Sequence, residues 1–127
     1  MIRYIWLAFF AALLISICTV DSVIVHRTFT TLHTDAVQIS AELEENGISE
    51  EAKNLIEKIE EYWLKKQRPF SIFIHHEETK ILGDKINLLK AYIQAASLDE
   101  ATIEAASLLY EIDILKKQYV FSITNIF

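Results

Sequence analysis

The chain has 127 residues, two glycines, one proline, one cysteine and a net charge of −6. Its length allows one small domain, and so few glycines and prolines argue against a β-sandwich or barrel, which needs frequent turns. The negative charge disfavours nucleic acid and electrostatic binding to anionic lipid headgroups. Helix-forming residues dominate, so we predict an all-α fold.

An uncharged stretch opens the chain. Residues Tyr4–Val20 read YIWLAFFAALLISICTV, and SVIV resumes the apolar run after Asp21. As a single helix, residues 4–25 would be about 33 Å long, enough to cross a bilayer core of roughly 30 Å. This predicts an N-terminal transmembrane helix that contacts the lipid bilayer through residues 4–25.

The span divides the chain into a transmembrane signal-anchor, residues 1–25, and an extracytoplasmic helical bundle, residues 26–127. Arg3 precedes the span, whereas Arg27 on the other flank is partly offset by Asp21. The positive-inside rule therefore favours a cytoplasmic N-terminus. The expected localisation is the cell membrane, as a single-pass protein.

Two other fates of the N-terminal stretch stay open. A signal peptide could be cleaved after Cys18, because Ser16 and Cys18 are small residues at the two positions that an A-x-A-like cleavage site requires. Acylation of Cys18 as a lipoprotein would require a small residue just before it, and Ile17 is not small. A buried helix of a soluble core fits less well because the stretch has no polar face.

The first helix of the bundle is expected to continue directly from the anchor. Its apolar residues follow steps of four and three, which keep one face against a neighbouring helix. These residues are Val25, Phe29, Leu32, Ala36, Ile39 and Leu43. The helix should end at Glu45–Gly47, with Gly47 as a left-handed cap.

A second helix is expected to begin after Ser49, which is a typical N-cap residue. Its predicted core face consists of Ala52, Leu55, Ile56, Ile59 and Trp63. Pro69 should stop or kink this helix, because proline lacks the backbone N–H that a helix interior uses.

A third helix is predicted from about Phe70 to Ala96. Gly83–Asp84 is expected to bend or split it. The apolar residues assigned to its core face are Phe73, Ile74, Ile81, Leu82, Leu88, Leu89, Tyr92 and Ile93.

The fourth helix should start at Ser97–Glu100, which fits the capping-box pattern. It carries a second heptad seam, formed by Ala101, Ala105, Leu108, Ile112, Leu115 and Tyr119. A lone amphipathic helix cannot hide its apolar stripe. We therefore predict a small antiparallel bundle, with self-association or a partner as further ways to cover these stripes.

The segment FSIFIHHEETK, residues 70–80, is the candidate for a chemical site. Adjacent residues on a helix point about 100° apart, so His75 and His76 do not easily face one metal ion. His75 with Glu78, one turn on, supplies two ligands, fewer than the three or four that zinc takes from proteins. A metal or pH sensor remains the alternative hypothesis, since histidine titrates near neutrality.

A structural role explains the same segment without a ligand. Glu77 and Glu78 could pair with Lys80 and Lys85 on a solvated face, and His75 could lie hydrogen-bonded at the edge of the core. No Gly-Xaa-Ser-Xaa-Gly elbow and no glycine-rich phosphate loop occurs in the sequence. We therefore expect neither enzymatic activity nor a cofactor.

The C-terminal tail YVFSITNIF is apolar to its last residue. An exposed apolar end packs back onto its own domain or docks on another protein. If the tail docks, an integral membrane protein is the expected partner.

Several short blocks together resemble a known family. They are Trp63 followed by two lysines, IHHEE at residues 74–78, LLKAYIQA at 88–95 and the ending SITNIF. The chain is similar in these to a family of spore-forming Gram-positive bacteria, domain of unknown function four-three-six-three. That resemblance implies a small, membrane-anchored helical protein without an established activity, with a multi-spanning membrane protein as partner.

The predicted function is thus a non-enzymatic helical interaction module, an accessory subunit of an integral membrane protein. The residues that the family pattern and the apolar tail mark for partner binding are Trp63, His75, His76, Glu77, Glu78, Asn125, Ile126 and Phe127.

Overall fold

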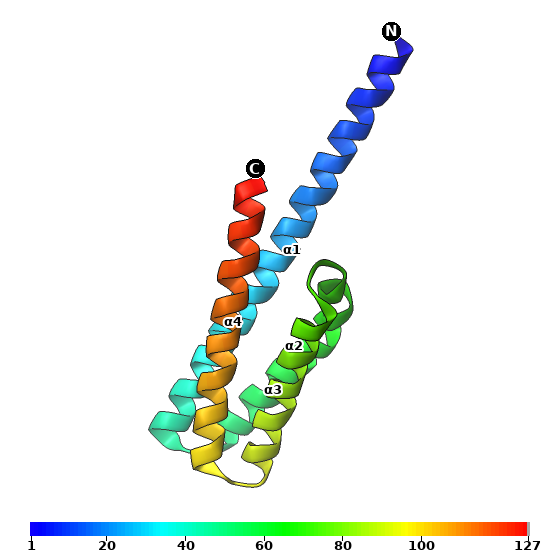
Figure 1. The fold of residues 1–127 in the computed structure, drawn as a ribbon. Helices are drawn as coiled ribbons and strands as arrows, with labels where there is room; N and C mark the ends of the chain where they lie inside the picture. The colour runs from blue at the N-terminus through cyan, green and yellow to red at the C-terminus, as the bar shows by residue number, and fades with distance from the viewer. Residues whose placement is uncertain (127) are drawn as a thin grey trace.

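A computed structural model describes the backbone of residues 1–126, and their side chains except those of 18–22, 69–73 and 120–126. This part of the chain forms four helices, which are α1 (Ile2–Asn46), α2 (Glu50–Phe73), α3 (His76–Gln94) and α4 (Leu98–Ile126). Consecutive helices run antiparallel, and each packs on two neighbours in a ring, with α4 closing on α1 (Figure 1). The prediction of an all-α antiparallel bundle is confirmed.

The two predicted heptad seams form the centre of the bundle. Every seam residue of α1 is buried, and so are those of α4 except Tyr119, which is half-buried against the same cluster. The other helices complete the core with Ala52, Ile56, Ile59, Trp63, Leu82, Ile86, Leu89 and Ile93. Steps of four and three keep each row on one side of its helix, which is why the pattern identified the core.

The predicted caps set the turn between α1 and α2. Gly47 has a φ of 69°, a conformation that glycine adopts without strain, and its N–H donates to the Leu43 carbonyl at 3.1 Å. The hydroxyl of Ser49 accepts a hydrogen bond of 3.1 Å from the N–H of Ala52 at the start of α2. The Ser49 cap is confirmed. Gly47 ends α1 as predicted, but its ψ of −150° lies outside the left-handed helical region, so the predicted left-handed cap is not formed.

The predicted boundary between the second and third helices is wrong. The α2 helix continues past Pro69 to Phe73, and α3 begins only at His76 and runs unbroken through Gly83–Asp84. A proline removes one backbone donor, and the remaining hydrogen bonds can carry a helix past it. Gly83 serves packing rather than a bend, since a Cβ atom there would lie 3.1 Å from Nε1 of Trp63.

The core face of α3 also differs from its prediction. Ile81 and Leu88 are exposed, whereas Ile86 is buried although it is not part of the predicted core face. The apolar residues of this segment are too many for one face, so periodicity alone did not separate the core row from the outer row.

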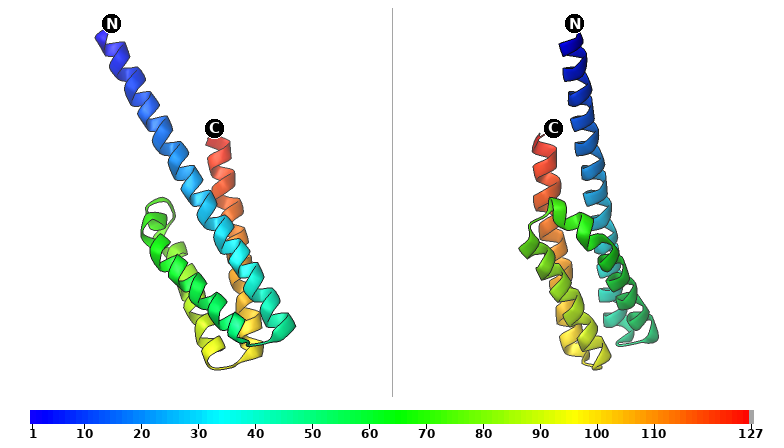
Figure 2. Two further views of the ribbon diagram at one scale, coloured as in Figure 1. Left: turned by 180° about the vertical axis from the view of Figure 1, so that it is seen from behind. Right: turned by 90° about the vertical axis from the view of Figure 1, so that its right-hand side faces the viewer.

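The N-terminal part of α1 extends beyond the other helices (Figures 1 and 2). Residues 2–17 of this helix are exposed throughout, and we call them the arm. From Val25 onward the same helix belongs to the bundle. The alternative of cleavage after Cys18 falls in residues 18–22, whose side chains lie outside the described part.

The expected single-pass localisation in the cell membrane is corrected by the structure. Within the part of the chain that is described, no helix has an apolar stretch of the length needed to cross a membrane. The predicted transmembrane helix, its lipid contact through residues 4–25 and the topology with a cytoplasmic N-terminus and an extracytoplasmic bundle are therefore not supported.

Candidate functional site

The predicted His75–Glu78 block lies at the start of α3, where it shapes the helix terminus. The His75 carbonyl accepts the N–H groups of Glu78 and Thr79, each at 3.1 Å, and the Thr79 hydroxyl at 3.3 Å. Glu77 and Glu78 occupy the first turn, where carboxylates are favoured by the helix dipole. His75, His76 and Glu77 are exposed, and Glu78 is half-buried.

Glu78 forms the main long-range contact of this block. The Tyr119 hydroxyl of α4 donates a short hydrogen bond to Oε2 of Glu78 and accepts one of 3.4 Å from the N–H of His75. The Tyr119 ring also stacks on Phe29 of α1, with 6.3 Å between ring centroids. We call this group, Phe29, His75, Glu78 and Tyr119, the tyrosine clasp, because it joins three helices.

Burial raises the pKa of the Tyr119 phenol above its ordinary value, and the hydrogen bond to Glu78 raises it further. The phenol therefore stays protonated and can keep donating to the carboxylate. The expected pairing of Glu77 and Glu78 with lysines is wrong for Glu78, whose partner is Tyr119, and Lys85 instead donates to the Ser107 hydroxyl at 2.6 Å. Nothing in the sequence linked Glu78 to Tyr119, since they lie far apart along the chain.

His76 faces a different side of α3 from Glu78. It lines a groove of about 280 Å³ between α2 and α3, together with Trp63, Gln67 and Asn87. Trp63 is only 3% exposed, so it is a core residue that forms the floor of this groove. The structure thus brings Trp63 and His76 together, and it separates both from Glu78.

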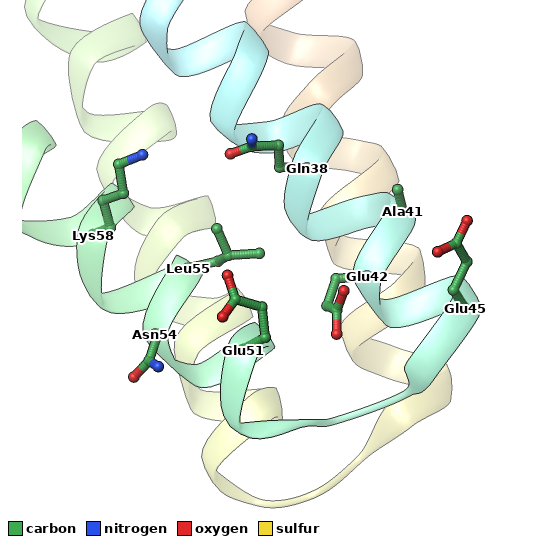
Figure 3. A pocket seen from close by; sticks show the side chains of 8 residues that line it. All are labelled: Gln38, Ala41, Glu42, Glu45, Glu51, Asn54, Leu55 and Lys58. Carbon is green, nitrogen blue, oxygen red and sulfur yellow. The ribbon is translucent and has the colours of Figure 1, made fainter.

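A second groove of about 460 Å³ lies between α1 and α2 (Figure 3). Glu42 and Glu51 face each other across it, and Lys58 and Gln38 lie at its other end. Glu42 is already engaged, because its Oε1 accepts hydrogen bonds from Asn46 at 3.0 Å and from Ser49 at 2.8 Å. These two hydrogen bonds hold the α1–α2 turn, and Glu42, Glu45 and Glu51 make the lining of the groove acidic.

Neither groove gathers ligands for a metal ion. Among the described side chains, no three histidine, cysteine, aspartate or glutamate residues are placed to hold one. A metal or pH sensor built on His75–Glu78 stays a prediction. Of the predicted tail residues, the side chains of Asn125 and Ile126, and all of Phe127, lie outside the described part.

The arm is the largest uncovered apolar surface that the structure describes. Its large apolar side chains are between 46% and 77% exposed. Successive residues point about 100° apart, so a run of apolar residues covers the whole circumference of the helix. These side chains are Ile2, Tyr4, Ile5, Trp6, Leu7, Phe9, Phe10, Leu13, Leu14, Ile15 and Ile17.

A family model described as "Domain of unknown function (DUF4363)" matches residues 20–126. The chain belongs to this family. The match covers the bundle and leaves the arm of this DUF4363 protein outside it, so the arm and the bundle can be considered separately. No curated protein and no solved structure matches the chain.

Proposed function

We propose that this DUF4363 protein is a non-enzymatic interaction module whose arm docks on a partner protein. The observation that carries the proposal is the exposure of large apolar side chains along residues 2–17. Single exposed apolar residues are ordinary on a protein surface, but a contiguous apolar surface of this size marks a site of interaction.

The free energy available from the arm supports docking. Burying one large apolar side chain contributes about 1.5–3 kcal/mol, so three or four of them supply on the order of 5–10 kcal/mol before the costs of association. Trp6, Phe9 and Phe10 are the strongest candidates, since large aromatic residues tend to dominate binding energy at interfaces.

An integral membrane protein is the partner class that we propose. Apolar side chains point from every side of the arm, and a helix that is apolar all round is normally surrounded by apolar neighbours. A partner with extended apolar surfaces between its own helices would cover the arm on more than one side. The family resemblance points to the same class.

The C-terminal end of α4 is proposed as a second docking element. It projects from the same end of the bundle as the arm (Figure 1). Its sequence, residues 120–127, is free of charged residues. A partner that binds the arm would therefore lie near this tail as well.

The bundle's polar groups support a binding role rather than catalysis. Glu78 is engaged by Tyr119, and the His75 carbonyl and N–H are occupied at the helix terminus. These contacts use the block to hold helices together.

Site-specific photo-crosslinking tests the proposal. A photoreactive residue would replace Phe9 in one variant and Leu64, a 57% exposed residue of α2, in the matched control. We expect Phe9 to attach one defined integral membrane protein and Leu64 not to attach it. Equal attachment at both positions, or no heterologous product at Phe9, would contradict the proposal.

Loss-of-function variants sharpen the same experiment. Phe9→Asn with Phe10→Asn should lower recovery of that partner at least tenfold while leaving the helical content unchanged. Deletion of residues 120–127 should lower recovery if the tail is the second docking element. A partner recovered equally by the arm variant and the full chain would exclude the arm.

A further inference from the structure

A second exposed apolar surface lies on the outside of the bundle, away from the arm. It consists of five side chains that are between 39% and 70% exposed. They are Ile81, Leu88, Ile103, Tyr110 and Ile114. We call this surface the α3–α4 face.

The two rows of this face are adjacent. Ile81 and Leu88 are two helical turns apart on α3, and Ile103 and Tyr110 have the same spacing on α4, so each pair points to one side of its helix. Lys85 lies between the first pair and Ser107 between the second, and the Lys85 ammonium donates to the Ser107 hydroxyl at 2.6 Å. This bond links α3 to α4 midway along the two rows.

A groove of about 280 Å³ lies on the α3 side of the face. Its lining combines Ile81 and Leu88 with Asp84, Lys85 and Glu104. Lys85 has a neutral hydroxyl as its hydrogen-bond partner, and none of the ion pairs among the described residues includes Lys85, Asp84 or Glu104. One cation and two carboxylates therefore lie within an apolar surface without an ion-pair partner.

We propose that the α3–α4 face binds a second copy of this chain as a two-fold symmetric dimer. A symmetric interface contacts itself, so every contact occurs twice and the surface must be self-complementary. The face meets this condition, because Lys85 of one copy can meet Asp84 or Glu104 of the other while the apolar rows cover each other. A partner of one charge sign would satisfy only part of this set.

The size of the face fits such a dimer. Five half-exposed large side chains offer on the order of 400 Å² of apolar surface, within the range of functional patches. A standard interface takes about 800 Å² from each partner, about half of it apolar. The polar residues beside the two rows would supply the rest. The arm is not part of this interface, so the inference is independent of the proposed function.

The first test compares two leucine substitutions in the full chain, in a mild detergent that covers the arm. Leu88→Glu places a carboxylate in the apolar row that the second copy would cover, and Leu64→Glu makes the same change on α2 outside the face. Sedimentation velocity should show a dimer for the unmodified chain and for Leu64→Glu, and at least a tenfold higher dissociation constant for Leu88→Glu. Circular dichroism checks that both variants keep their helices.

Three outcomes would overturn the proposal. They are a monomeric unmodified chain, association that survives Leu88→Glu, and equal loss of association in both variants. The second of these would point to self-association through another surface of the bundle.

A mixing experiment tests the charge contact itself. Lys85→Glu should weaken the homodimer, and so should the double variant Asp84→Lys with Glu104→Lys, because each places like charges in contact. A one-to-one mixture of the two should dimerise, since every contact between unlike chains is then of opposite sign. A mixture that remains monomeric would contradict the charge contact, whereas contacts within one chain cannot produce the recovery.

Discussion

The two parts of α1 have similar apolar side chains in opposite surroundings. In the bundle, Val25, Phe29 and Leu32 are at most 2% exposed, whereas Phe9, Phe10 and Leu13 of the arm are between 46% and 59% exposed. Both parts lie on one unbroken helix. The difference therefore comes from the neighbours that each part has, not from its helical structure.

This comparison shows what the heptad spacing achieves. In the bundle part, apolar residues recur at steps of four and three, and the intervening positions are polar except Val37 and Ala41, so one face meets α2 and α4. In the arm, apolar residues occupy consecutive positions, and one neighbouring helix could cover only part of them. The bundle part therefore stabilises the fold, whereas the apolar side chains of the arm stay exposed.

The largest expected effect separates the two parts with one matched substitution. Phe29→Ala should lower the free energy of unfolding by about 3–5 kcal/mol, because it leaves a cavity and removes the stack on Tyr119. Phe9→Ala should change it by less than about 0.5 kcal/mol, because the exposed side chain loses little. Urea unfolding followed by circular dichroism measures both, and similar losses would mean that the arm is packed in solution.

Much of the bundle could be predicted because its rules are local. The seams of α1 and α4, the caps Gly47 and Ser49 and the start of α4 depend on residues within a few positions of one another. The predictions that were wrong concern residues whose neighbours are distant in the sequence. Ile81 and Leu88 could not be assigned to the outside without knowing where α4 lies.

The candidate site was less predictable for the same reason. The sequence marked Glu78, but its partner Tyr119 comes from another helix, and no local pattern connects them. The sequence marked Trp63 and His76 without showing that they share a groove. The transmembrane prediction depended on the apolar composition of residues 4–25, and no helix in the described part of the chain has the apolar stretch that it requires.

The next largest effect on the free energy of unfolding is expected at Asp35, a buried carboxylate in the bundle part of α1. Asp35 is 4% exposed; its Oδ1 lies 3.5 Å from Nζ of Lys58, and among the described groups its Oδ2 has no hydrogen-bond partner. Replacing a poorly satisfied buried carboxylate by an apolar side chain is often stabilising. Asp35→Leu should therefore raise the free energy of unfolding by about 1–2 kcal/mol.

The control for this prediction is Asp113→Leu. Asp113 pairs with Lys117 at 3.1 Å on the surface, and such pairs contribute little. Its replacement should change stability by less than about 0.5 kcal/mol. A loss of stability in Asp35→Leu would show that the carboxylate has a partner that stabilises it, such as bound water.

The tyrosine clasp marks the end of the bundle nearest the arm, and Tyr119→Phe measures its strength. The substitution keeps the ring against Phe29 but removes the hydrogen bonds to Glu78 and His75. Such losses typically amount to about 1–2 kcal/mol. Urea unfolding at neutral pH should show this decrease, and an unchanged midpoint would mean that water replaces the phenol.

The pH dependence of the same variant gives a sign that can be checked. The folded state raises the pKa of Tyr119, so it binds the phenolic proton more tightly than the unfolded state does. This contribution is complete below the unfolded pKa of about 10 and is lost as the pH rises through the folded pKa. The stability difference between the unmodified chain and Tyr119→Phe should therefore shrink above about pH 10. A difference that grows there would contradict the assignment.

The smallest expected effects lie at the exposed histidines. His75→Ala and His76→Ala should each change stability by less than about 0.5 kcal/mol, because both imidazoles are in solvent and the bonds at His75 come from its backbone. Because no three described side chains are placed to hold a metal ion, added zinc should leave the unfolding midpoint of the unmodified chain unchanged. A bound metal would raise the midpoint, since it would stabilise the folded state by mass action. A zinc-dependent rise that both substitutions abolish would instead establish the sensor hypothesis. It would also give the start of α3, rather than the arm, the leading role in function.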